Sequence, residues 1–146
     1  MAPSSDGAAA PFFCYADRRM ADDPFDLERF LAAQSGGVYE QALAELAAGA
    51  KRSHWIWFIF PQHRDLGRSP TAKYYGLSGV EEAAAYAAHP VLGPRLRESI
   101  AAIRVHLEAG RTAEQLLGEI DALKLRSSLA NFRAAAPDEP AFRLDP

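Results

Sequence analysis

The sequence predicts an all-α fold, a single-domain irregular bundle of about six to seven helices. Three observations support this prediction. Apolar residues recur every three to four positions along most of the chain, which is the spacing of amphipathic helices. Capping residues, prolines and glycines separate these stretches from one another. The apolar segments are not joined by Asn-Gly or Asp-Gly turns, and none alternates as a half-buried strand does.

The first two helices are expected at residues 23–34 and 38–48. Asp23 is a suitable N-cap, and the proline that follows it suits the first position of a helix. The glycine pair at 36–37 ends the first helix, and Gly49 ends the second, because glycine readily adopts the left-handed conformation found after helix ends.

Residues 55–60 are rich in aromatic and β-branched side chains, which by propensity favour a strand. A lone strand would have no partner for its buried backbone groups, and such groups are costly to leave unpaired. We therefore expect a short buried helix, capped by Ser53 and ended by the following proline. It should place Trp55 or Trp57, together with Phe58, at the centre of the core.

The second half of the chain contains the longest helix. The elements expected there are, in order, a short helix at 70–75, a helix at 78–88, the longest helix at 90–110, a short helix from 112 and a last helix from 121. Ser78 with Glu81, and Thr112 with Gln115, have the spacing of capping boxes. Asp121 is expected to cap the last helix.

A change in composition divides the chain into a flexible N-terminal extension, residues 1–21, and one helical domain, residues 22–142. We interpret Met20 as the true start of the protein. The alternative is that the extension is a docking peptide built on Phe12 and Phe13.

Composition and charge exclude several classes of protein. With 49% hydrophobic and 24% charged residues, the chain of 146 residues is not a disordered protein. A net charge of -3 gives no general nucleic-acid signature. Cys14 is the single cysteine, which excludes an intramolecular disulfide and a cysteine-based zinc site. The longest uncharged run in the body, 53–63, is too short to cross a bilayer.

Motifs for cofactors and metals are also missing. The sequence has no P-loop, no dinucleotide-binding glycine pattern and no nucleophile elbow. The four histidines show no close metal-ligand spacing. We therefore expect no cofactor, no metal site and no membrane association, and a cytoplasmic location, since the N-terminus lacks a secretory signal.

The segment 51–75 is chemically unlike its flanks. It carries five cations against one acid and six of the 15 aromatic residues. Cations beside aromatic rings suit an anionic ligand with a flat ring, because arginine binds phosphate and tryptophan stacks on a base. The other interpretation, which the usual burial of Trp and Phe favours, is that the aromatic residues form the core and the cations a solvated rim.

Two further places could hold an anion. His89 precedes the proline that starts the longest helix, and Arg95 lies within two turns of it. The alternative, which we favour, is that His89 is an ordinary helix cap. Lys124 and Ser128 share a helix face, which could bind an anion but is more typical of a solvated surface.

Six stretches of the chain resemble a family of bacterial proteins, DUF1810, a domain of unknown function. They are residues 23–27, 42–46, 51–62, 66–70, 89–96 and 123–128. The most specific are the patterns His-Trp-x-Trp-Phe-x-Phe-Pro-Gln and His-Pro-x-Leu-Gly-x-Arg-Leu. The resemblance covers about residues 22–142 and implies a small all-α protein of the bacterial cytoplasm, with no established activity.

This chain differs from the resembled family at both ends. Members usually begin near Met20, and they continue past Phe142 into a closing C-terminal helix, which we expect this chain to lack. A domain without that helix would expose apolar surface. Such a surface invites a partner, aggregation or a weak homo-oligomer.

Together these observations predict a helical domain that binds a small anionic or nucleotide-like ligand. The residues expected to bind it are His54, Trp57, Gln62, Arg68, Ser69, His89 and Arg95. Whether a reaction follows is open; the candidates for a general base are His89 and His54. One alternative is a structural or protein-interaction module without catalytic activity. The other is a protein that binds single-stranded nucleic acid weakly and without sequence preference, since we expect no specific nucleic-acid partner.

Overall fold

The structure is a computed structural model that describes residues 23–144, and these residues form helices and no strand, so the all-α prediction is confirmed. The expected extension at 1–21 lies outside the described residues. The elements are α2 (Glu28–Gln34), α3 (Val38–Ala48), α4 (Ile56–Ile59), the 3₁₀ turn η1 (Arg64–Leu66), α5 (Pro70–Tyr74), α6 (Val80–Ala88), α7 (Leu92–Glu108), α8 (Ala113–Leu117), α9 (Glu119–Ala135) and the 3₁₀ turn η2 (Pro140–Phe142).

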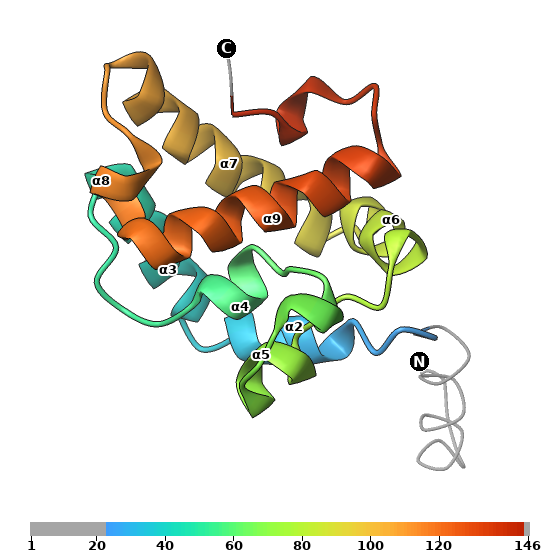
Figure 1. Ribbon diagram of the computed structural model, residues 1–146. Helices are drawn as coiled ribbons and strands as arrows, with labels where there is room; N and C mark the ends of the chain where they lie inside the picture. The colour runs from blue at the N-terminus through green and yellow to red at the C-terminus, as the bar shows by residue number, and fades with distance from the viewer. Residues whose placement is uncertain (1–22, 145–146) are drawn as a thin grey trace.

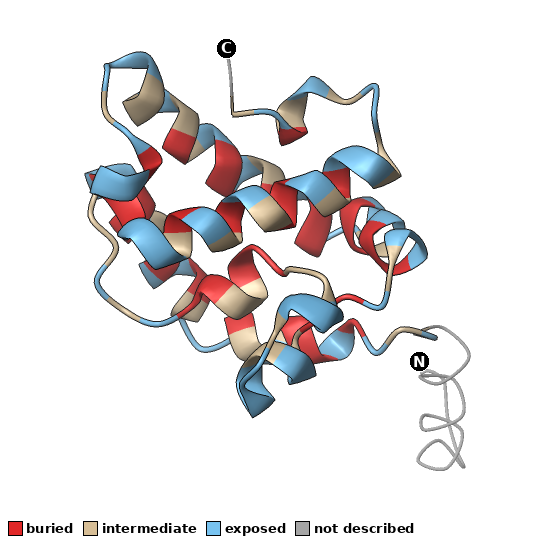
Figure 2. Cartoon of the chain, viewed as in Figure 1, coloured by how far each residue is buried: buried red, intermediate tan, exposed pale blue. Residues whose placement is uncertain are grey.

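Two long helices, α7 and α9, organise the bundle, and α9 crosses the middle of the molecule in Figure 1. Helix α6 packs against both of them, α3 packs against α7, and α8 and α4 pack against α9. Buried and exposed residues alternate around α9, whereas α5 has no buried residue (Figure 2). The apolar periodicity of residues 38–48 and of the longest helix matches the buried faces of α3 and α7, which include Tyr39, Ala42, Leu46, Leu92, Leu96, Ile100 and Ile103.

A chain of aromatic rings runs through the core from the first described helix to the last turn. Phe30 meets Tyr86 edge to face, with ring centroids 5.0 Å apart. Tyr86 lies 5.4 Å from Phe132, and Phe132 lies 5.6 Å from Phe142. These spacings are favourable for aromatic pairs. Because the four rings come from α2, α6, α9 and η2, they tie both ends of the described chain into one core.

The aromatic segment forms a short buried helix, as predicted. Trp55 is 1% exposed and sits in the core, while Trp57 and Phe58 are only partly buried. The prediction that Ser53 caps this helix is wrong, because α4 has no side-chain cap. The Ser53 hydroxyl instead donates a hydrogen bond to the carboxylate of Glu45, 2.6 Å away.

Glu45 is a buried carboxylate that organises the chain leading to Trp55. Its oxygens accept hydrogen bonds from five donors: the backbone N–H of Arg52 and of Ser53, the Ser53 hydroxyl, the Trp55 indole and the Gln41 amide. Burial by itself raises the pKa of Glu45, but these hydrogen bonds outweigh it and hold the pKa well below its usual value.

A buried ion pair joins α2 to α6. Arg29 donates to the Glu82 carboxylate at 2.8 Å, and both side chains are almost inaccessible to solvent. The remaining donors of this guanidinium reach backbone carbonyls in the turns before α2 and after α5: Phe25, Asp26, Tyr74 and Gly76. Breaking such a pair leaves an uncompensated buried charge, which makes it expensive.

Several helix starts differ from the sequence-based expectation. Helix α2 begins at Glu28, later than predicted, although Asp23 still accepts from the backbone N–H groups of Leu27 and Glu28. The predicted capping box of Ser78 with Glu81 is wrong. Glu82 takes that place and accepts from both the N–H and the hydroxyl of Ser78, since Arg29 draws its carboxylate inward.

Of the caps predicted for the last two helices, the one for α8 is confirmed and the one for α9 is wrong. Thr112 and Gln115 form the predicted capping box at the start of α8. Asp121 does not cap the last helix, because α9 begins two residues earlier, after Gly118. Asp121 instead lies in the first turn, where Lys51 holds it in an ion pair at 2.8 Å.

The five hydrogen bonds to Glu45 lead to a prediction about stability. Glu45→Ala leaves the buried Trp55 indole and backbone donors without an acceptor, so we expect it to cost about 3 kcal/mol or more of unfolding free energy. Glu40→Ala on the same helix removes an exposed carboxylate and should change stability by about 0.5 kcal/mol at most. Urea unfolding measures both; equal losses would contradict the role of Glu45.

The lowered pKa of Glu45 gives a prediction about pH. A carboxylate whose pKa is lower in the folded state contributes stability above its unfolded pKa of about 4.3 and loses it as the pH falls toward the folded value. The difference in unfolding free energy between wild type and Glu45→Ala should therefore be largest at neutral pH and shrink below about pH 4. A difference that grows in acid would contradict the assignment.

Candidate functional site

A cavity of about 660 Å³ opens between the segment before α4 and the start of α9. We call it the α9 pocket. It is lined by Lys51, Arg52, His54, Ile56, Trp57, Leu117, Gly118, Glu119, Ile120, Asp121 and Lys124. The lining combines apolar residues with charged ones, a combination typical of small-molecule sites.

Two of the charged residues in the α9 pocket hold the pocket together. The Lys51 ammonium pairs with Asp121 at 2.8 Å, donates to the Ser53 carbonyl and lies 4.9 Å from the Trp55 ring centroid. The Lys51 N–H also donates to the carbonyl of Leu116, which joins this segment to α8. Asp121 is thereby neutralised, and the two sides of the pocket are fixed relative to each other.

Three other side chains of the α9 pocket are free to meet a ligand. Arg52 and His54 are exposed, and within the described residues neither side chain makes a hydrogen bond or an ion pair. Trp57 is partly buried and presents a ring to the cavity wall. The Lys124 ammonium lies 5.3 Å from the centroid of that ring, within cation–π range.

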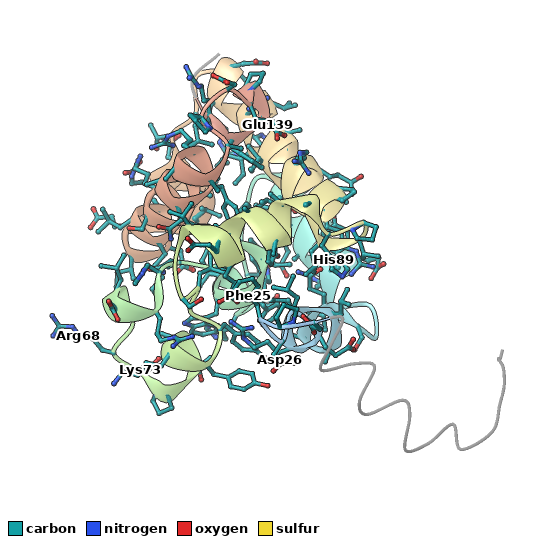
Figure 3. The ribbon with its side chains drawn as sticks, turned by 90° about the vertical axis from the view of Figure 1, so that its right-hand side faces the viewer. Phe25, Asp26, Arg68, Lys73, His89 and Glu139 are labelled. Carbon is teal, nitrogen blue, oxygen red and sulfur yellow. The ribbon has the colours of Figure 1, made fainter. Side chains whose placement is uncertain are left out.

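The structure brings only two of the seven predicted ligand-binding residues, His54 and Trp57, into the α9 pocket. Gln62 borders a crevice of about 10 Å³, which is barely room for one water molecule. The Ser69 hydroxyl accepts the backbone N–H of Ala72 and so caps α5. Arg68 is exposed and projects away from the bundle in Figure 3.

His89 and Arg95 lie in a different part of the molecule. The His89 Nδ1 accepts the N–H groups of Val91 and Leu92, each at 3.1 Å, so the interpretation as a helix cap is confirmed. Figure 3 shows His89 and Arg68 on opposite sides of the bundle. Capping with Nδ1 occupies the lone pair that a neutral imidazole would need there to act as a base.

Arg95 is engaged in packing between helices. It donates to the Gln34 side chain at 3.1 Å and lies 4.7 Å from the ring centroid of Tyr39. The glycine in the same helix also serves packing, because a Cβ at Gly93 would come within 2.3 Å of the Ala87 carbonyl oxygen. Close approach of α6 to α7 thus requires glycine at this position.

Sequence reasoning missed the residues that complete the α9 pocket. Arg52 was visible as part of the basic segment, and Lys124 as part of a separate candidate. Nothing in their spacing indicates that Arg52 and Lys124 line the same cavity. The cavity forms because the Lys51–Asp121 ion pair and the hydrogen bond from the Lys51 N–H to the Leu116 carbonyl join residues about 65 to 70 positions apart.

Two negative findings concern the described residues alone. Among the side chains of residues 23–144, no group of three His, Cys, Asp or Glu residues is arranged to hold a metal ion. Over the same range, no helix combines the length and apolar character needed to cross a bilayer.

Comparison with known proteins places the chain among proteins without an assigned activity. Residues 24–144 match the family described as "Protein of unknown function (DUF1810)". The crystal structure of the conserved hypothetical protein Rv1873 from Mycobacterium tuberculosis is similar, with 48% sequence identity and a TM-score of 0.78 over 84% of this chain and 85% of that one. No curated protein sequence matches the chain. The chain belongs to the DUF1810 family.

Proposed function

We propose that this protein binds a small anionic ligand with a flat ring, such as a nucleotide, in the α9 pocket. The observation that carries the proposal is the meeting of an accessible tryptophan, Trp57, with unengaged Arg52 and His54 around one cavity. The expected contacts of Gln62, Arg68, Ser69, His89 and Arg95 with the same ligand are not part of this proposal, because these residues lie elsewhere.

The charges of the α9 pocket support an anion. Three cations, Lys51, Arg52 and Lys124, line it together with two acids, Glu119 and Asp121. Asp121 pairs with Lys51 at 2.8 Å and with Lys124 at 4.0 Å. The three cations still exceed the two acids by one charge, and Arg52 is the cation with no ion pair among the described residues. Arginine binds a phosphate through two parallel hydrogen bonds, and lysine supplies a compact positive charge.

The apolar residues of the α9 pocket support a ligand with a flat ring. Trp57 offers an aromatic face, and Ile56, Leu117 and Ile120 extend the apolar surface around it. Stacking on an aromatic side chain contributes about 1–3 kcal/mol per base. A cavity of about 660 Å³ also lies within the range, about 300–1,000 Å³, in which small-molecule sites usually fall.

Binding without catalysis is the better-supported form of the proposal. His54 is the candidate base in the pocket, but within the described residues no acceptor or carboxylate hydrogen-bonds to its ring. A general base is usually oriented by a second group that fixes its tautomer. His54 is therefore assigned to contact the ligand and not to transfer a proton.

A second candidate function is a protein-interaction module. It is favoured by Ile120 and Leu123, which are 70% and 64% exposed at the start of α9, beside the pocket. Apolar residues at this spacing share one helix face and suit a partner surface. Leu123→Ser should weaken such an interaction while leaving the binding of a nucleotide almost unchanged, because Leu123 does not line the α9 pocket.

The ligand proposal is tested by calorimetric titration with adenosine monophosphate and with ribose 5-phosphate. We expect the nucleotide to bind about tenfold more tightly, since only it can stack on Trp57. Trp57→Leu should remove this difference, because it keeps apolar volume but not the ring. Arg52→Ala should weaken both ligands about tenfold, as expected for a lost charge-assisted hydrogen bond.

Arg68→Ala is the matched control, because it removes the same charge from an exposed residue outside the α9 pocket. Its affinity for both ligands should equal that of wild type. The proposal fails if neither ligand binds at millimolar concentration, or if Arg52→Ala and Arg68→Ala have the same effect. Thermal unfolding of each variant checks that the fold is intact.

A further inference from the structure

A second cavity, of about 470 Å³, lies between the second half of α9 and the chain that follows η2. We call it the arginine groove. Its lining consists of Arg126, Leu129, Arg133, Arg143 and Leu144. It shares no residue with the α9 pocket and is not needed for the proposed nucleotide site.

The arginine groove gathers positive charge with little to neutralise it. Its lining contains three guanidinium groups and, among the described residues, no acid. Arg126 pairs with Glu114 at 2.8 Å in a half-exposed ion pair. Arg143 makes one long contact, 3.4 Å, to the Pro137 carbonyl, and the Arg133 side chain has no hydrogen bond or ion pair within the described residues.

Arg126 and Arg133 lie on the same face of α9. Arg126, Leu129 and Arg133 are spaced by three and four residues on α9, so their side chains project to the same side. Leu129 is completely buried, which fixes the register of this face against the core. The backbone positions of Arg126 and Arg133 are thus held two turns apart on α9.

The third arginine is positioned by contacts from α7. Arg104 donates to the carbonyls of Pro140, Ala141 and Arg143, and Arg97 binds the Glu139 carboxylate, which is labelled in Figure 3. Burial of Phe142 in the aromatic core fixes the same segment from within. Arg143 therefore faces α9 from an anchored stretch of chain.

We propose that the arginine groove binds a small, multiply charged oxyanion of the oligophosphate class. Within the described residues Glu114 at Arg126 is the one acidic partner of the three arginines. Gathering like charges with so little compensation is unfavourable, and an oligophosphate relieves it by accepting two hydrogen bonds from each of Arg133 and Arg143. Arg133 and Arg143 make the principal contacts, because their donors are least engaged. Arg126 contributes less, because its two terminal nitrogens already donate hydrogen bonds to Glu114.

The ligand of the arginine groove differs in kind from that of the α9 pocket. The groove has no aromatic residue in its lining, so it offers nothing on which a ring could stack. The α9 pocket has fewer uncompensated cations but has Trp57. A probe with several phosphates and no ring, inorganic tripolyphosphate, should therefore favour the arginine groove, and substitutions of Arg133 and Arg143 show whether it binds there.

The test is calorimetric titration of inorganic tripolyphosphate into the full chain at an ionic strength of about 0.15 M, where the Debye length is about 8 Å. We expect Arg133→Ala and Arg143→Ala each to weaken binding about tenfold or more, the loss usual for charge-assisted hydrogen bonds. Arg133→Lys keeps the charge but not the paired donors, so its affinity should lie between those of wild type and Arg133→Ala. Orthophosphate, with fewer oxygens and less charge, should bind more weakly than tripolyphosphate.

Two control variants distinguish binding of tripolyphosphate in the arginine groove from its general electrostatic attraction to the protein. Arg68→Ala and Lys73→Ala each remove one exposed cation outside both cavities. Both should leave the affinity for tripolyphosphate within about twofold of wild type, since exposed charges at a distance are screened. Equal losses in all four alanine variants, or no binding at millimolar concentration, would overturn the proposal.

Discussion

The carboxylate of Glu45 is the constraint on which the candidate site depends. It gathers the backbone of residues 52 and 53, the Ser53 hydroxyl and the Trp55 indole around one buried charge. These bonds fix the chain that leads into α4, and Lys51, at its edge, then reaches across to Asp121 and to the carbonyl of Leu116. The position of His54 and Trp57 beside the start of α9 follows from this series of contacts.

Much of the fold could be predicted because local rules decide it. The bounds of α3, the end of α6, the buried helix α4 and the capping box of Thr112 follow from periodicity and capping within about ten residues. The failed cap predictions have identifiable causes. Glu45 binds the Ser53 hydroxyl. Helix α9 begins after Gly118, which puts Asp121 inside its first turn, where it pairs with Lys51. Sequence periodicity does not show which distant residue will bind a capping side chain.

The candidate site was less predictable than the fold. His54 and Trp57 were found because the sequence places them together, three residues apart. Ser69 and His89 have side chains suited to binding an anion, but the same oxygen and nitrogen atoms suit helix caps, and capping is what they do. The arginines of the arginine groove lie 7 and 10 residues apart in sequence, and only the anchored turn η2 brings the third one to α9.

The unequal burial of the two tryptophans gives this protein two separate optical signals. Trp55 is enclosed, with its indole N–H bonded to a carboxylate, so its emission should be blue-shifted and shielded from quenchers dissolved in water. Trp57 borders the α9 pocket beside the Lys124 ammonium, where iodide can reach it. A quenchable, red-shifted component therefore reports events at the pocket, and the protected component reports the integrity of the core. Unfolding and occupancy of the pocket become distinguishable in one emission spectrum without any added label.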